Sequence, residues 1–148
     1  MTPFICAGTG FLLAVLWFDL MFDVQIARGR TRQPEEALAS IAGYYRRVTT
    51  AARPMNRLIA AVMLGTCTSI VLQIVRGERP RWVGWVALLL AGAPILLASI
   101  RTVPHAVRLG AQADSLAMQQ KLATSIYREH LVCASSIFAV LAIEVCFA

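Results

Sequence analysis

Charged residues are scarce in this sequence, making up 15% of its 148 residues, whereas soluble domains typically carry about 25%. Lysine is almost missing, because Lys121 is the only lysine among the 14 basic residues. The sequence also contains no Walker loop, no GxSxG motif, no HExxH motif and no dinucleotide fingerprint. These absences argue against a soluble domain and against the enzyme classes that those motifs define.

Four long apolar runs dominate what is present, and 58% of the residues are hydrophobic. A helix needs about 20 apolar residues to cross a bilayer, and the runs cover residues 4–25, 56–75, 82–100 and 131–147. The first run lacks the basic flank and the cleavage site of a signal peptide, so we expect an uncleaved span. The sequence therefore predicts an all-α integral membrane bundle of four transmembrane helices, formed by residues 1–148 as a single domain.

Two further helical segments are expected between the spans. Pro34 begins a segment that extends to about Val48 with apolar residues on one side, which predicts an amphipathic helix in loop one, lying on the cytoplasmic membrane surface. The third span is expected to end at Ile100, with Pro104 in the loop that follows. The last helix is expected to start at Ser115 and to project into the cytoplasm before its span.

The net charge of +6 is segregated by loop. Loop one carries Arg28, Arg30, Arg32, Arg46, Arg47 and Arg53, and loop three carries Arg101, Arg108, Lys121 and Arg128. The positive-inside rule places both loops in the cytoplasm and both termini outside, in a plasma membrane or a bacterial inner membrane. Expected partners are anionic lipid headgroups, a second copy of the chain or a larger membrane complex, but not nucleic acid.

The ends of the four spans bring ionisable residues to one membrane face. Asp19 and Asp23 lie one helical turn apart in the first span, where a buried carboxylate is costly without a partner or a ligand. The predicted cluster at this cytoplasmic level consists of Asp19, Asp23, Arg57, Arg101, His105 and His130, with Glu129 beside it. In a structural interpretation, the two aspartates form ion pairs with Arg57 and Arg101.

Two functional interpretations compete with the structural one. In the first, Asp19, Asp23, His105 and His130 are candidate metal ligands, or the two histidines are heme ligands. No ExxH or HxxxH spacing supports this, so no metal and no cofactor is predicted. In the second, the cluster is a proton-handling or small-ligand pocket, with Asp19 and His130 as candidate catalytic residues.

The four cysteines form no CxxC pair and all lie within the spans. Cys6 and Cys146 are expected at similar depth near the outer surface, where they either form a disulfide between the first and last spans or remain free thiols.

Several segments resemble the anthrone-oxygenase-like family of small four-helix membrane proteins. These are AGTGFLLAV in the first span, YYRRVTTAARP before the second, the tryptophan-led third span, the T-x-P-x-x-x-R-L run from Thr102 to Leu109, and His130 at the start of the fourth span. The resemblance implies a membrane oxidoreductase acting on a hydrophobic aromatic substrate, and it transfers no catalytic residue. The residues themselves favour a non-enzymatic subunit or a binder of a hydrophobic ligand, and the oxidoreductase is the alternative.

Overall fold

The computed structural model describes residues 1–27 and 34–147, and this part of the chain consists of helices joined by short connections. Arg28, Arg30 and Arg32 of the first loop lie outside the described residues. The helices are α1 (Thr2–Ala27), α2 (Pro34–Thr50), α3 (Arg53–Arg76), α4 (Arg81–Leu97), the π-helical turn η1 (Ala98–Thr102), α5 (Val103–Ala111) and α6 (Leu116–Cys146).

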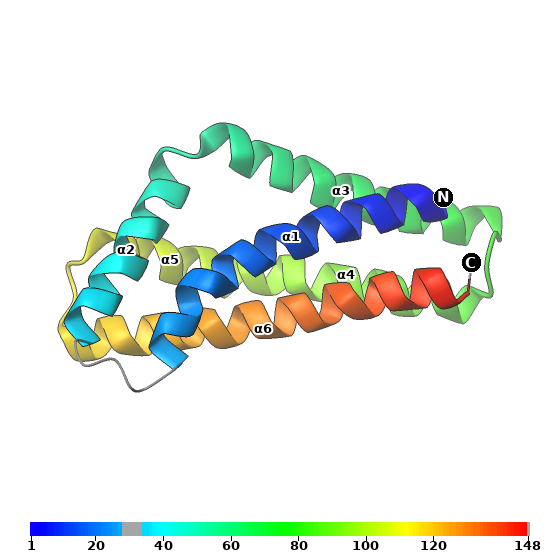
Figure 1. Cartoon of the computed structure of the whole chain (residues 1–148). Coiled ribbons are helices and arrows are strands. Elements are labelled where there is room, and N and C mark those ends of the chain that lie inside the picture. Colours follow the sequence, from blue (N-terminus) through cyan, green and yellow to red (C-terminus); the bar gives the residue numbers. More distant parts are fainter. Residues whose placement is uncertain (28–33, 148) are drawn as a thin grey trace.

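Four long helices run side by side (Figure 1). Both α6 and α3 pack against α1 and α4, whereas the backbones of α3 and α6 do not pack directly against each other over the described residues. At the end near the two chain termini, the four helices close around a shared core of Ile5, Ile70, Ala87, Ala91 and Val140. At the opposite end α3 diverges from the other helices and connects to α2, which crosses there (Figure 1).

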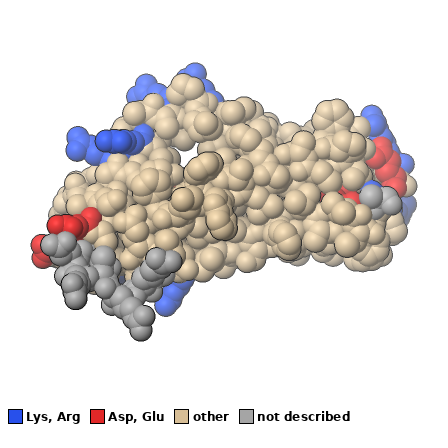
Figure 2. All heavy atoms as spheres, viewed as in Figure 1, with Lys and Arg blue, Asp and Glu red and all other residues tan. Residues whose placement is uncertain are grey.

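Within the part of the chain that the structure describes, four helical stretches are long and apolar enough to cross a membrane: Thr2–Ile26, Arg53–Arg76, Arg81–Ala111 and Leu116–Cys146. Charged side chains gather at the two ends of the face in Figure 2, and uncharged residues form the surface between them. Exposed tryptophans, leucines and phenylalanines are numerous, as expected of a surface in contact with lipid rather than water.

The helix of the third span continues past Ile100, the residue at which that span was expected to end. The helix continues to Ala111 through the π-helical turn η1, where the N–H of Val103 donates a hydrogen bond to the carbonyl of Ala98. This shift from the i+4 to the i+5 pattern occurs one residue before Pro104, which has no N–H to donate. Pro104 is therefore accommodated at the start of α5 instead of beginning a loop.

The amphipathic helix expected in loop one is part of α2, but its apolar side is not free to rest on the membrane surface. Leu38, Ile41 and Tyr45 pack with Leu109 of α5 and Ile126 of α6 in a second buried core. The apolar face is buried because the continuous α4–η1–α5 helix places protein against it.

The close packing of α2 against α5 depends on Gly110. A Cβ atom at this position would lie 2.9 Å from the backbone nitrogen of Arg46, too near for any side chain.

The last helix agrees with its expected start, since Ser115 is its N-cap residue and α6 extends to Cys146. At about 1.5 Å per residue its 31 residues exceed a hydrocarbon thickness of about 30 Å.

Candidate functional site

Asp23 is the centre of a buried hydrogen-bond network that joins three helices. One carboxylate oxygen, Oδ1, accepts a hydrogen bond of 2.6 Å from the hydroxyl of Tyr45, and the other, Oδ2, lies 2.7 Å from Nδ1 of His130. The Asp23 side chain is 0% exposed, and Tyr45 and His130 are 3% and 7% exposed. This geometry places a proton on Nδ1 of His130 and turns Nε2 away from Asp23.

Asp19 lies one turn before Asp23 on the same face of α1, because residues four apart are neighbours on a helix. Its Oδ1 accepts a hydrogen bond of 2.6 Å from the hydroxyl of Tyr44. Its Oδ2 is 4.0 Å from Nε2 of His130, which is an ion-pair distance but too long for a hydrogen bond. Each aspartate therefore has its own tyrosine partner, and both face His130.

The adjacent tyrosines of α2 reach different carboxylates because neighbouring side chains on a helix point about 100° apart. Burial and the negative charge of Asp23 raise the pKa of Tyr45 above its ordinary value. Burial and the hydrogen bond to Asp19 do the same to the pKa of Tyr44. Both phenols consequently keep their protons and act as donors.

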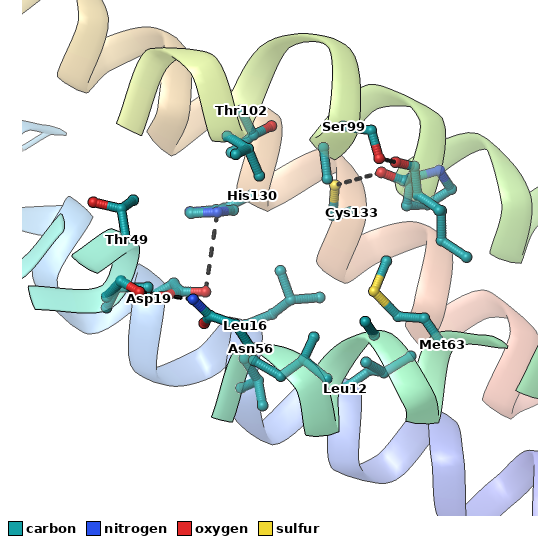
Figure 3. A pocket seen from close by; sticks show the side chains of 18 of the residues that line it. Leu12, Leu16, Asp19, Thr49, Asn56, Met63, Ser99, Thr102, His130 and Cys133 are labelled. Atoms are coloured by element: carbon teal, nitrogen blue, oxygen red, sulfur yellow. Dashed lines mark hydrogen bonds and ion pairs between the residues drawn. The ribbon is translucent and has the colours of Figure 1, made fainter. Parts of the chain in front are cut away.

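A cavity of about 440 Å³ opens beside this network. It occupies the space between α3 and α6 at the end where α3 diverges, and α2 lies over it. Figure 3 shows Asp19 and His130 facing each other on its wall, with Leu12, Leu16 and Met63 among the apolar side chains around it. The volume lies within the range of small-molecule sites, which are mostly apolar and contain a few polar groups.

The opposite wall of the cavity is formed by the irregular part of the α4–α5 helix. Pro94, Ala98, Ser99 and Thr102 line the cavity, and three of these four residues belong to η1. The π-helical turn changes which residues of this helix face the cavity, and such turns are frequent at functional sites. Cys133 of α6 completes this side, 4.0 Å from the carbonyl oxygen of Pro94 (Figure 3).

The ion pairs expected between the aspartates and Arg57 or Arg101 do not form. Arg101 lies 3.6 Å from Glu129, and Nδ1 of His105 lies 3.3 Å from the same carboxylate. Arg57 is exposed and pairs with no carboxylate among residues 1–27 and 34–147. Glu129 and His130 are adjacent on α6 and therefore point to different faces of this helix. Arg101 lies on the face of Glu129, whereas Asp19 and Asp23 lie on the face of His130.

The structure thus divides the predicted cluster into two groups. Asp19, Asp23 and His130 form the site on the α1 and α2 side, whereas Arg101 and His105 gather around Glu129 on the α5 side. Tyr44 and Tyr45 are not part of the predicted cluster, because the sequence pattern places them on the apolar side of the helix that begins at Pro34. Two hydroxyls on that buried face were the available signal, since a buried hydroxyl needs a partner.

A smaller polar group lies near the opposite end of the bundle. Nε2 of Gln73 donates a hydrogen bond of 3.1 Å to Glu144, and both side chains are buried. The structure joins none of the four cysteines in a disulfide, and Cys6 is partly buried whereas Cys146 is exposed. The disulfide between these two residues stays a prediction.

Among the described residues, no group of three or more His, Cys, Asp or Glu side chains is arranged to hold a metal ion. The expected absence of a metal and of a cofactor stays a prediction, with the metal and heme ligand sets as its alternatives. Comparison with protein-family models, with curated proteins and with solved structures found no match for this chain. The anthrone-oxygenase resemblance therefore stays a prediction.

Proposed function

We propose that this chain is a multi-pass membrane protein that binds a hydrophobic small molecule between its helices. The observation that carries the proposal is the cavity of about 440 Å³, whose wall is mostly apolar but includes Asp19 and His130. An apolar cavity with a few fixed polar groups holds the body of a ligand by burial and orients it by hydrogen bonds. The divergence of α3 leaves this space while the core at the other end holds the four helices together.

The test uses naphthalene as a rigid apolar probe and thermal unfolding in mild detergent as the readout. A ligand that binds only the folded protein, at 100 times its Kd, raises the free energy of unfolding by about 2.7 kcal/mol. We expect naphthalene to raise the melting temperature of the wild-type protein by several degrees. Replacing the cavity residue in Ala98→Phe should abolish this shift.

Ala93→Phe is the matched control, because Ala93 is an exposed residue of α4 that does not line the cavity. It adds the same phenylalanine without filling the cavity, so it should keep the shift seen in the wild-type protein. An equal shift in both variants would mean that the probe acts through the detergent, and the binding proposal would fail.

We also propose that loops one and three face the cytoplasm and both termini face outward, since the basic residues favour this orientation. The test places single cysteines in a cysteine-free background at Pro80, between α3 and α4, or at Ala113, between α5 and α6; both are exposed. A thiol reagent that cannot cross the membrane should label Pro80→Cys in intact cells and spare Ala113→Cys. The reverse pattern would invert the orientation.

A second candidate function is acid–base chemistry on the bound molecule, the basis of the oxidoreductase alternative. The distance of 2.7 Å between Asp23 and Nδ1 of His130 favours it, because it directs Nε2 toward the cavity as a proton acceptor. Hydrophobic metabolites from membranes containing wild-type or His130→Gln protein can be compared by mass spectrometry. A compound that the wild type depletes and the variant leaves unchanged supports an enzyme, and identical profiles argue against one.

A further inference from the structure

The charges around the cavity are unbalanced. Asp19 is the only carboxylate among the described residues that line it, and no lysine or arginine is among them. Asp23 lies directly behind His130 and adds a second negative charge. With both carboxylates ionised and His130 protonated, two negative charges face one imidazolium, so one negative charge remains.

The hydrogen bonds show which carboxylate oxygen is left without a donor. Both oxygens of Asp23 are occupied, by Tyr45 and by His130, and Oδ1 of Asp19 is occupied by Tyr44. Oδ2 of Asp19 has His130 only at 4.0 Å, and Nε2 of His130, a side chain 9% exposed, makes no hydrogen bond to a described residue. Both unpartnered atoms belong to residues of the cavity wall (Figure 3).

The nearby arginines do not compensate Asp19. Arg101 pairs with Glu129, and Arg57 is exposed, so neither belongs to the cavity wall. The tyrosine hydroxyls are neutral donors, because the pKa values of Tyr44 and Tyr45 are raised. A buried charge without a partner is costly in apolar surroundings, and a cation brought by the ligand would remove that cost.

We propose that the ligand of this cavity is a lipophilic cation, such as a hydrophobic amine or a quaternary ammonium compound, whose charge pairs with Asp19. This inference rests on the proposed binding function and specifies its ligand class. The apolar wall holds the hydrocarbon part, Oδ2 of Asp19 faces the positive charge, and anionic amphiphiles are repelled. Opposite charges attract strongly where the effective dielectric constant is low.

The experiment compares three probes that share a naphthalene ring and differ in charge. They are (2-naphthylmethyl)trimethylammonium, its neutral carbon analogue 2-neopentylnaphthalene, and the anion 2-naphthaleneacetate. Binding is measured by isothermal titration calorimetry on the full chain in nanodiscs of zwitterionic phosphatidylcholine, with empty nanodiscs as the blank. We expect the cation to bind at least tenfold more tightly than the neutral analogue and the anion to show no binding.

Asp19→Asn should abolish the preference for the cation and leave the affinity of the neutral analogue unchanged. Glu78→Gln is the matched control, because it removes a carboxylate in the α3–α4 connection, outside the cavity, and should preserve the preference. Equal affinities of the cation and the neutral analogue in the wild-type protein would overturn the inference. This comparison decides the question even if Asp19→Asn fails to fold.

The outcomes separate this inference from the function on which it rests. Binding of the neutral analogue without a preference for the cation keeps the binding function and refutes the ligand class. Absence of binding by all three probes refutes both. A preference for the cation that persists in Asp19→Asn would show that another group attracts the charge, which also overturns the assignment to Asp19.

Discussion

Replacing Tyr45 by phenylalanine removes one hydroxyl and preserves the aromatic ring that packs between α2, α5 and α6. The lost hydrogen bond is the one of 2.6 Å to Oδ1 of Asp23, a side chain that is 0% exposed. Water does not reach this oxygen, so the substitution leaves a carboxylate oxygen buried without a donor. Hydrogen bonds to charged groups contribute about 1.5–3 kcal/mol, and we expect Tyr45→Phe to lower the free energy of unfolding by that amount.

Tyr44→Phe is the informative comparison, since it removes an equally short hydrogen bond to the neighbouring aspartate. Asp19 is 16% exposed and borders the cavity, where water can replace the lost donor. We therefore expect Tyr44→Phe to cost about 1 kcal/mol or less. The chemical change is identical in the two variants, so the difference between them measures the burial of the two carboxylates.

The assay is unfolding in mild detergent, followed by circular dichroism, for the wild type and the two variants. Tyr127→Phe serves as the control, because Tyr127 lies on α6 outside the network, and it should change the free energy of unfolding by less than about 0.5 kcal/mol. A loss in Tyr44→Phe equal to or larger than that in Tyr45→Phe would refute the argument that Asp23 is the buried centre of the site.

Three further predictions concern packing and titration. Gly8→Leu should destabilise the protein, because a Cβ at Gly8 would overlap a side chain of α3, whereas Gly10→Leu should be tolerated in open space; unfolding curves of the two variants compare them. Because its pKa is raised in the folded protein, Tyr45 contributes stability that is fully present at pH values below the ordinary tyrosine pKa of about 10. This contribution is lost as the pH rises toward the raised pKa. Alkaline titration of unfolding should therefore show a steeper loss in the wild type than in Tyr45→Phe, and parallel curves would contradict this. Arg108 holds the pKa of Asp114 below its ordinary value, so Arg108→Gln should raise that pKa in an NMR titration, and an unchanged pKa would exclude Arg108 as the cause.

The sequence by itself determined the helices and their approximate extent. Apolar runs of about 20 residues favour long helices whatever surrounds them, because each helix satisfies its own backbone hydrogen bonds. The expected final helix from Ser115 to Cys146 agrees with α6 for the same local reason. Asp19, Asp23 and His130 could be selected as site residues because charge within an apolar run is costly wherever the chain folds.

The tertiary structure decided which partners these residues have. Several combinations of aspartate, arginine and histidine share one level of the bundle, and only the packing of α1 and α2 against α6 pairs the aspartates with His130 and the two tyrosines. The cavity likewise arises from the divergence of α3, and only the arrangement of the helices brings η1 to its wall. Hydropathy and charge act along the chain, whereas side-chain pairing depends on the rotation and separation of neighbouring helices, which residue order alone does not specify.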